Sequence, residues 1–431
     1  MYSLLFEVCY NHALHCRPFV GDEVAKSDLS SAFSSQEIRH YLGLPTSLGC
    51  LCISQNLQWF RTCDIRPVIQ LEPELSTFGL RTRKTRDDSM TQSGPSADSG
   101  AEFVREMARS FWYSAILRAA IKLDIFALLE DNPQTSQEVA LLIGASPRYT
   151  QAFLDCCAVL ELLHVSDGKF SNSSTASGFL VKGKESYVGD HALHHTNTWA
   201  SWGRLDEVIR EGKTLLPFET GFVDPGTYWN DYMIGQHNRA TSGQARQLVQ
   251  SLDIKDRRNL LDLGGGAASY SIALCEANPL LKAVVIDQKE PLAVAKSLVE
   301  QSSSYDRITL LEGSFFETDI GTGYDVCLIS GVVLISPEED CRRLFTLAFD
   351  ALEPGGLVVI QDYMRLDDNP QRKRLDTLED LYVLVVFNPG AGDREGAEVT
   401  SWLEEAGFIN PKSLPLPTQL GLITAEKMPA P

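Results

Sequence analysis

The sequence predicts an α/β protein whose C-terminal part is a doubly wound, mostly parallel, Rossmann-like sheet, preceded by a mostly helical region. Three observations carry this prediction. From Arg258 onward, short apolar runs alternate with stretches of helical spacing, which is typical of strand–helix–strand units. The first of these runs ends in the glycine string 264–266. The stretch 102–163 instead has apolar residues at three- and four-residue spacing, which indicates helices.

Length, composition and charge bound the kind of protein. A chain of 431 residues is long enough for two or three domains, and 44% hydrophobic residues supply the cores. The net charge of −19 repels phosphate groups, which argues against nucleic-acid partners and against docking on anionic membranes. No apolar run approaches the ~20 residues of a membrane-spanning helix, and the start lacks the basic region of a signal peptide. We therefore expect a cytoplasmic protein.

The first hundred residues differ from the rest of the chain. Residues before Met90 show no sustained periodicity, and the stretch 81–100 is polar and contains Ser, Gly and Pro. We expect 1–100 to be a disordered extension, or the product of a start codon assigned too far upstream. Cys50 and Cys52 are spaced as CxC, without a second pair at zinc spacing, so we expect no metal site there.

Residues 101–184 predict a winged-helix domain. A buried helix over 102–130 is followed by a short helix with a capping box at Thr135, a longer helix over 146–163, and a hairpin around 167–168. The helix that would read DNA carries a single basic residue. We therefore expect this domain to pack against a second copy of the chain rather than to bind nucleic acid.

The region 185–250 is predicted to be mostly helical and is rich in large aromatic and polar side chains. We expect it to connect the two domains and to form a wall of a substrate pocket. The alternative is a packed helix pair whose histidines make ordinary hydrogen bonds. His191, His194 and His195 have a spacing that a metal ion accepts, but no carboxylate cluster accompanies them, so we predict no metal.

Residues 251–431 predict the doubly wound sheet, in which right-handed crossovers join parallel strands. The expected strands lie at 259–265, 282–288, 307–315, 324–333 and 355–364, with helices at 269–279, 291–301, 337–352 and 397–406.

Features at the ends of the first two strands predict a nucleoside cofactor. Gly264 and Gly266 follow the first strand, where glycine lets backbone approach a ligand without a Cβ in between. Asp287 ends the second strand, where a carboxylate can accept hydrogen bonds from both ribose hydroxyls. This pair fits either a nicotinamide dinucleotide or S-adenosyl-methionine. Ser269 in place of a third glycine, and Asp262 beside the loop, both favour the cofactor that carries an ammonium and a sulfonium.

About three quarters of the chain resembles the winged-helix, dimer-forming, small-molecule O-methyltransferases, which include caffeate and acetylserotonin methyltransferases. The strings DLGGG, VVID, GSFF and LEPGG, in this order, carry the resemblance. It implies binding of S-adenosyl-methionine by Gly264, Asp287 and the pair Ser314 and Phe315, with Ser330 near the methionine end. Ser314 stands where family members usually have Asp. The resemblance further implies a homodimer and methyl transfer, above all O-methylation, to a small aromatic or polyketide-like acceptor.

The catalytic position departs from the family pattern. In the family, a histidine after the fourth strand is the general base, and two carboxylates orient it. The resemblance places Leu334 at that histidine, while Asp362 and Asp393 match the two acidic positions. It also places Met233 and His237 in the wall of the acceptor pocket.

Three alternatives follow from the missing histidine. Transfer can rely on positioning alone, onto an acceptor that is already acidic or that reacts at carbon or nitrogen. Another base, either Asp362 or His237, can replace the histidine. The protein can also bind the cofactor without its usual chemistry.

Two other functions fit parts of the sequence. A ligand-sensing regulator would use the winged helix, and a nicotinamide-dependent oxidoreductase would use the glycine loop. Binding of duplex DNA would favour the regulator. Protection by NAD rather than by S-adenosyl-homocysteine would favour the oxidoreductase.

Overall fold

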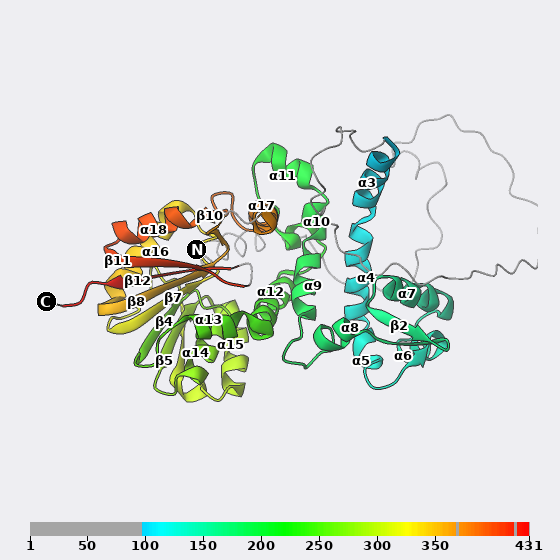
Figure 1. Ribbon diagram of the computed structural model, residues 1–431, viewed down its shortest axis with the longest axis horizontal. Helices are drawn as coiled ribbons and strands as arrows, with labels where there is room; N and C mark the ends of the chain where they lie inside the picture. Colours follow the sequence, from blue (N-terminus) through cyan, green and yellow to red (C-terminus); the bar gives the residue numbers. More distant parts are fainter. Residues whose placement is uncertain (1–96, 368–369, 418–419, 431) are drawn as a thin grey trace, which may run out of the picture. The chain divides into compact units, whose positions relative to one another are not determined.

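The computed structural model describes residues 97–367, 370–417 and 420–430, and Figure 1 shows it as a ribbon. The expectations for the region 1–100 therefore fall almost entirely outside the described residues. None of the helices within the described ranges is long and apolar enough to cross a membrane.

The C-terminal part of the chain is built on a seven-stranded sheet with the order β11-β12-β8-β7-β4-β5-β6. Strands β8, β7, β4, β5 and β6 are parallel, as predicted, whereas β12 runs antiparallel to β8 and to β11. The strand order reverses between β4 and β7, and doubly wound sheets bind ligands at such a switch point. The strands are β4 (Asn259–Leu263), β5 (Lys282–Asp287), β6 (Ile308–Glu312), β7 (Tyr324–Ser330), β8 (Leu352–Asp362), β11 (Phe408–Pro415) and β12 (Gly421–Lys427).

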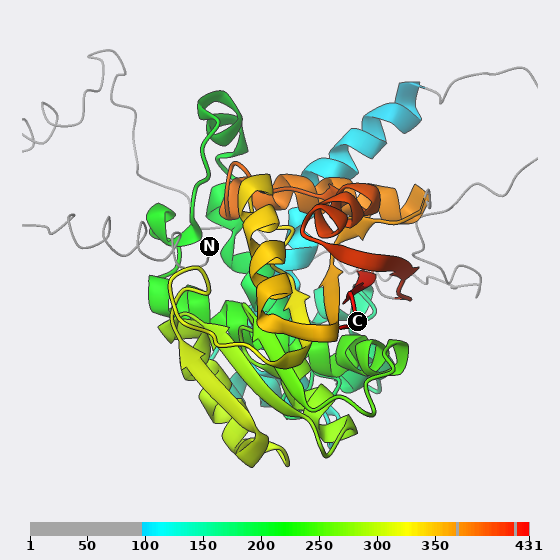
Figure 2. The same ribbon diagram turned by 90° about the vertical axis from the view of Figure 1, so that its left-hand side faces the viewer.

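Helices cover both faces of this sheet, and Figures 1 and 2 show the resulting layers from two sides. One face carries α16 and α18, and the other carries α13, α14 and α15. The bounds are α13 (Ala245–Ser251), α14 (Ser269–Ala277), α15 (Lys289–Gln301), η3 (Tyr305–Arg307), α16 (Glu338–Ala351) and α18 (Gly396–Glu405). The short pair β9 (Met364–Arg365) and β10 (Arg394–Glu395) forms a separate parallel ladder.

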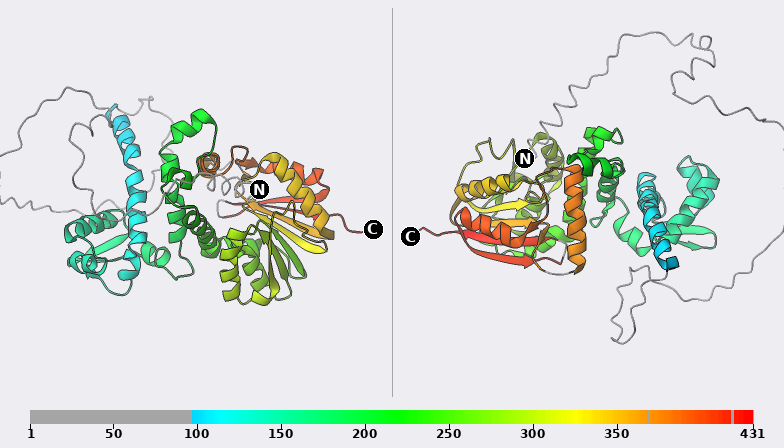
Figure 3. Two further views of the ribbon diagram at one scale, coloured as in Figure 1. Left: turned by 180° about the vertical axis from the view of Figure 1, so that it is seen from behind. Right: turned by 90° about the horizontal axis from the view of Figure 1, so that it is seen from above.

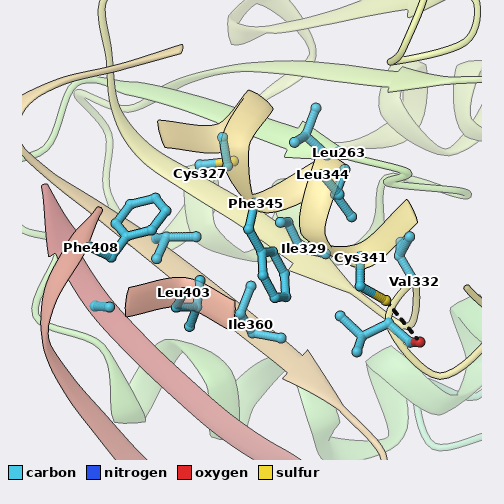
Figure 4. Close-up of a cluster of buried hydrophobic side chains, with 14 of the residues drawn as sticks. Leu263, Cys327, Ile329, Val332, Cys341, Leu344, Phe345, Ile360, Leu403 and Phe408 are labelled. Atoms are coloured by element: carbon cyan, nitrogen blue, oxygen red, sulfur yellow. Dashed lines mark hydrogen bonds between the residues drawn. The ribbon is translucent and has the colours of Figure 1, made fainter. Parts of the chain in front are cut away.

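A hydrophobic core fills the space between the sheet and α16. Phe345 of α16 packs with Ile329 of β7 and Ile360 of β8, and Figure 4 shows this cluster. All three side chains are fully buried. Burial of a side chain of this size contributes about 1.5–3 kcal/mol. This buried cluster therefore supports β7 and β8, whose ends lie at the cofactor region.

The N-terminal elements follow the predicted order, with one difference. The capping box at Thr135 is present, since its hydroxyl accepts the Glu138 N–H and the Glu138 carboxylate accepts the Thr135 N–H at 2.8 Å. The hairpin turn is also where it was predicted. The predicted buried helix over 102–130 was wrong, because it is divided into three helices and the first exposes Phe103. The elements are α3 (Ala97–Arg109), α4 (Phe111–Lys122), α5 (Ile125–Leu128), β1 (Gln134–Thr135), α6 (Ser136–Leu142), α7 (Pro147–Val159), β2 (Leu163–Ser166), β3 (Lys169–Asn172) and α8 (Ser174–Phe179).

The region 185–250 is mostly helical, as predicted, and α9 packs along α12. Gly235 of α12 permits this close approach, because a Cβ there would lie 3.0 Å from the His191 Cα. The elements are α9 (Gly189–Asn197), α10 (Trp199–Trp202), α11 (Leu205–Glu211), η1 (Pro217–Thr220), α12 (Pro225–Arg239) and the π-helical turn η2 (Ala240–Gln244).

The sequence patterns missed α17 (Pro370–Val386) and the β11–β12 hairpin. Helix α17 changes from a charged first half to an apolar second half, so it shows no single apolar stripe. Strand β11 contains a register shift and two prolines, which obscure the strand alternation. Helix α17, orange in Figure 3, contacts α10 and β9, and its residues Glu379, Tyr382 and Val383 help to enclose the site described next.

Candidate active site

A cavity lies between the ends of β4, β5, β7 and β8 and the helices α9, α12 and α17. Its empty space is about 1030 Å³, including the mouth that opens to solvent. The part lined by the glycine loop, Asp262 and Asp287 is called the cofactor half below. The part lined by Tyr232, Met233 and Leu334, with neighbouring residues of α9, α12 and α17, is called the acceptor half.

The glycine loop needs glycine for two separate reasons. Gly264 and Gly266 have φ values of 73° and 54°, in the left-handed region that favours glycine. A Cβ on Gly264 would lie 2.8 Å from Val332 Cγ2, and one on Gly265 would lie 2.6 Å from Val285 Cγ1. The loop can therefore follow the strand end closely and leave space above its backbone for a ligand.

Asp287 lies in the cofactor half at the end of β5, as the sequence predicted. Its carboxylate accepts the N–H of Gly266 at 2.8 Å and the N–H of Gln288 at 2.7 Å. Burial raises the pKa of this carboxyl to about 6, although the two backbone N–H groups oppose the rise. Each oxygen keeps a second lone pair, so the carboxylate can still accept hydrogen bonds from two ribose hydroxyls.

Asp262 supplies a second buried carboxyl, at the end of β4. One oxygen accepts the Ser271 hydroxyl at 2.6 Å, while the other has no hydrogen-bond partner among the described residues. Burial raises the pKa of Asp262 to about 7. An unpartnered buried oxygen is costly unless a ligand binds it, and an ammonium group would do so. The cofactor half therefore fits S-adenosyl-methionine, which carries both ribose hydroxyls and an ammonium.

The structure does not place all the predicted cofactor residues in the cavity wall. Ser330 lines the cavity, and Gln361 Nε2 donates to its hydroxyl at 3.2 Å. Phe315 is buried beneath Gly264, and the Ser314 hydroxyl accepts the N–H of Phe316 at 3.3 Å. Neither Ser314 nor Phe315 lines the cavity, so their role in binding adenine stays a prediction.

Leu334 lines the acceptor half, and its match to the family's histidine stays a prediction. The nearby Asp362 is fully buried, and its carboxylate accepts the N–H groups of Val333 at 2.8 Å, Leu334 at 3.1 Å and Tyr363 at 2.8 Å. Burial raises the pKa of Asp362 to about 6. Three backbone donors occupy this carboxylate, so its evident task is to hold the turn that carries Leu334.

Asp393 and His237 lie outside the cavity wall. Asp393 forms an ion pair with Arg365, and its N–H donates to Asp380 at 2.8 Å. His237 Nδ1 lies 2.9 Å from the Ser269 hydroxyl, and burial lowers the pKa of its imidazole. The structure thus brings Met233 into the acceptor half, but it does not bring His237 or Asp393 there.

Three further groups in the acceptor half were not predicted as site residues. Arg239 donates to the Tyr363 hydroxyl at 2.5 Å and to Gln236 at 2.9 Å. His194 Nε2 lies 2.7 Å from the Tyr382 hydroxyl, and both rings line the cavity. The helical spacing of Tyr232, Gln236 and Arg239 was a sequence signal that could have predicted one common face toward the cavity. No sequence pattern indicated that α17 forms part of the cavity wall.

The histidines of α9 approach one another. The Nε2 atoms of His191 and His195 are 3.2 Å apart. Burial, followed by the charge of Arg239, lowers the pKa of His195 to about 4, and the pKa of His194 falls well below its usual value. Within the described ranges, no group of three or more His, Cys, Asp or Glu side chains could hold a metal ion.

Comparison with known proteins agrees with this arrangement. A family model described as the O-methyltransferase domain matches residues 202–409, and one described as the O-methyltransferase dimerisation domain matches residues 105–182. The 3-hydroxy-5-methyl-1-naphthoate 3-O-methyltransferase of Streptomyces sahachiroi is 29% identical, over 70% of this chain and 88% of that protein. The tetracenomycin polyketide synthesis 8-O-methyltransferase of Streptomyces glaucescens is 28% identical, over 71% of this chain and 91% of its own length.

The solved structures show the same fold. Human N-acetylserotonin methyltransferase in complex with S-adenosyl-methionine has a TM-score of 0.69 and 23% identity, and the match covers 78% of this chain and 99% of that one. The two family models together span the N-terminal elements, the connecting helices and most of the sheet. The chain therefore belongs to the S-adenosyl-methionine-dependent O-methyltransferases that carry an N-terminal dimerisation domain.

Proposed function

We propose that this protein transfers a methyl group from S-adenosyl-methionine to a hydroxyl oxygen of a small aromatic or polyketide-like acceptor. One observation carries the proposal. The cofactor half and the acceptor half form one continuous cavity, so a donor held by the glycine loop faces an acceptor held against Tyr232, Met233 and Phe387. The relatives named above act on a naphthoate and on a tetracenomycin polyketide, which supports an acceptor of this class.

In the cofactor half, we assign each predicted residue a part in binding. Asp287 accepts the ribose hydroxyls and Asp262 accepts the ammonium, while Ser330 lies near the methionine end. Ser314 and Phe315 are assigned to adenine. The bound cofactor supplies a methyl group on a sulfonium, which is already activated toward a nucleophile. The protein therefore has to hold two partners in line and exclude water.

In the acceptor half, positioning carries the reaction because Leu334 supplies no base. Correct placement of two reactants can contribute roughly 7–11 kcal/mol. Asp362 contributes indirectly by holding the Val333–Leu334 turn, and Met233 packs against the acceptor. We assign Asp393 no contact with substrate, since its carboxylate pairs with Arg365.

We also infer that the protein acts as a homodimer in the cytoplasm. The dimerisation domain supports this assembly. Helices α3 and α4 expose large apolar side chains, among them Phe103 at 63%, Met107 at 60% and Phe111 at 61%. An exposed apolar face of this kind is typical of a protein–protein interface.

Calorimetric titration of the full chain with S-adenosyl-homocysteine tests the cofactor assignment. We expect micromolar binding to the wild type and about 100-fold weaker binding to Asp287→Ala, since charge-assisted hydrogen bonds contribute about 1.5–3 kcal/mol each. Glu300→Ala, which changes an exposed carboxylate on α15, is the matched control and should bind like the wild type. A wild type that binds no S-adenosyl-homocysteine would overturn the proposal.

A second measurement tests transfer itself. Wild type and S-adenosyl-methionine are incubated with hydroxylated naphthalenes and anthraquinones, and methylated products are identified by mass spectrometry. An O-methyl ether is the expected product. Binding of S-adenosyl-homocysteine without any turnover would instead favour a cofactor-binding protein that has lost transfer.

A further inference from the structure

The acceptor half contains a fixed cation. Arg239 is the last residue of α12, and the π-helical turn η2 follows it directly. Its guanidinium lines the cavity, lies 5.2 Å from the centre of the Tyr363 ring, and donates to Tyr363 and Gln236. These two bonds engage two of its five N–H groups. The group is therefore held firmly in the cavity wall and retains capacity to donate to a ligand.

Other charged and titratable groups surround this guanidinium. Glu379 of α17 and Asp362 of β8 face it with negative charge, and the phenols of Tyr232, Tyr270 and Tyr363 face it as neutral groups. Three backbone N–H groups already bind the Asp362 carboxylate. A bound cofactor adds a sulfonium beside the acceptor. Arg239 and this sulfonium would both favour an anionic acceptor, and Glu379 supplies the opposing charge.

The histidines of α9 do not supply the missing base. Burial and the charge of Arg239 lower the pKa of His195 to about 4, and His191 and His194 are lowered further. An imidazole with such a pKa is a poor proton acceptor for a phenol, whose pKa is about 10. The cavity therefore favours an acceptor that is ionised before the methyl group moves.

We infer, on the basis of the proposed function, that Arg239 binds the acceptor oxygen as an anion and selects phenols or enols conjugated with a neighbouring carbonyl. Two oxygens on one planar edge match the planar fork of the guanidinium. The electron pair of the oxyanion forms the new O–C bond, and the electron pair of the broken C–S bond stays on sulfur. No proton has to be removed in this step, so Leu334 is compatible with turnover.

The test uses a spectroscopic property of the acceptor. 1-Hydroxyanthraquinone carries a hydroxyl beside a carbonyl, and its ionised form has its own visible absorption band. The full chain is saturated with S-adenosyl-homocysteine and titrated with base in the presence of this dye. Because an opposite charge within about 4–6 Å lowers the pKa of an acid by about 1–3 units, we expect the pKa of the bound dye to fall by at least about one unit.

Four variants separate charge from shape. Arg239→Gln should return the pKa of the bound dye to that of the free dye, while Arg239→Lys should keep most of the decrease. Glu379→Gln should lower the pKa of the bound dye further, because this change removes the negative charge that opposes Arg239. Arg246→Gln changes an exposed arginine on α13 and should behave like the wild type. Binding of S-adenosyl-homocysteine to each variant confirms that it is folded.

The same variants give an independent readout in methyl transfer. The acid limb of the kcat/KM profile for Arg239→Gln should move to higher pH by the amount measured with the dye. Equal dye pKa values in wild type and Arg239→Gln, or a wild type that binds S-adenosyl-homocysteine but not the dye, would overturn the inference. Failure to bind S-adenosyl-homocysteine would instead contradict the proposed function.

Discussion

The two halves of the cavity differ in what builds them. The cofactor half consists of strand ends and a loop that follow one another within 26 residues, from Asp262 to Asp287. The acceptor half gathers side chains from α9, α12, the turn after β7 and α17, which are separated by up to about 190 residues, as for His194 and Tyr382. The cofactor half is fixed by local backbone geometry, and the acceptor half is fixed by tertiary packing.

We expect this difference to make the two halves tolerate change differently. A glycine loop has few alternatives, because its φ values and the space around it exclude other side chains. A wall of packed side chains can exchange one residue for another of similar size. We therefore expect changes in the cofactor half to abolish binding and changes in the acceptor half to alter the choice of acceptor.

The largest effect is expected for Gly265→Ala. Its Cβ would lie 2.6 Å from Val285 Cγ1 and 2.7 Å from the Asp262 carboxyl, so the loop would have to shift. Overpacking of this kind costs about 1–3 kcal/mol, and tenfold in affinity is about 1.4 kcal/mol. The shifted loop would also displace the Asp262 carboxyl. We therefore expect S-adenosyl-homocysteine to bind about 100-fold more weakly in calorimetric titration.

Gly321→Ala is the control for this change. Gly321 also has a positive φ, of 72°, but no atom lies within 4 Å of the added Cβ. This variant should lose some stability through backbone strain and keep its affinity for S-adenosyl-homocysteine. Equal affinity of the Gly265→Ala variant and the wild type would show that the loop is not the part that binds the cofactor.

A gain of activity is expected for Leu334→His. The new imidazole would stand where the Asp362 carboxylate already holds the backbone, and a general base contributes about 10²–10⁴-fold when it is well placed. Because this site was not built around a histidine, we expect only about a 10-fold increase in kcat/KM. The increase should appear for weakly acidic phenols and not for acidic ones. Leu334→Asn, a polar residue without a basic ring, is the control, and an equal gain there would contradict a role as base.

The contrast between the two halves also explains which cavity residues could be predicted from the sequence. Gly264, Asp262 and Asp287 were predicted as cavity residues because their spacing is set by one strand, one turn and the next strand. Tyr382 was missed because it reaches the cavity only through the packing of α17, which no local pattern records, whereas Arg239 was missed although it shares a face of α12 with Tyr232. His237 was expected in the acceptor wall, but it lies one residue beyond Gln236 on α12 and faces Ser269 instead.

A third prediction concerns proton release on cofactor binding. The free protein holds Asp262 with a pKa of about 7 and Asp287 with a pKa of about 6, both raised by burial. An ammonium bound at Asp262 favours the ionised form, so binding releases a proton below pH 7. We therefore expect the affinity for S-adenosyl-homocysteine to rise about 10-fold from pH 5 to pH 7 and then to level off. Titrations in two buffers of different ionisation enthalpy measure the released protons.

Asp262→Asn checks the source of this proton. The variant should bind more weakly and release fewer protons, while Glu300→Gln should match the wild type. A wild type whose affinity is unchanged from pH 5 to pH 7 would show that Asp262 is already ionised before binding, or that it does not contact the ammonium.

The smallest effect is expected for His237→Ala, and it separates two neighbouring histidine positions. His237 does not line the cavity and bonds to Ser269, which does line it, whereas His195 lines the acceptor half. His237→Ala should therefore change the KM of the acceptor less than about threefold, and its main effect should be a loss of about 1 kcal/mol in stability from one hydrogen bond. His195→Ala removes part of the wall and should raise the acceptor KM several-fold. The reverse order of the two KM effects would place His237 at the acceptor, as the resemblance first implied, and would require the ring to leave Ser269 when the acceptor binds.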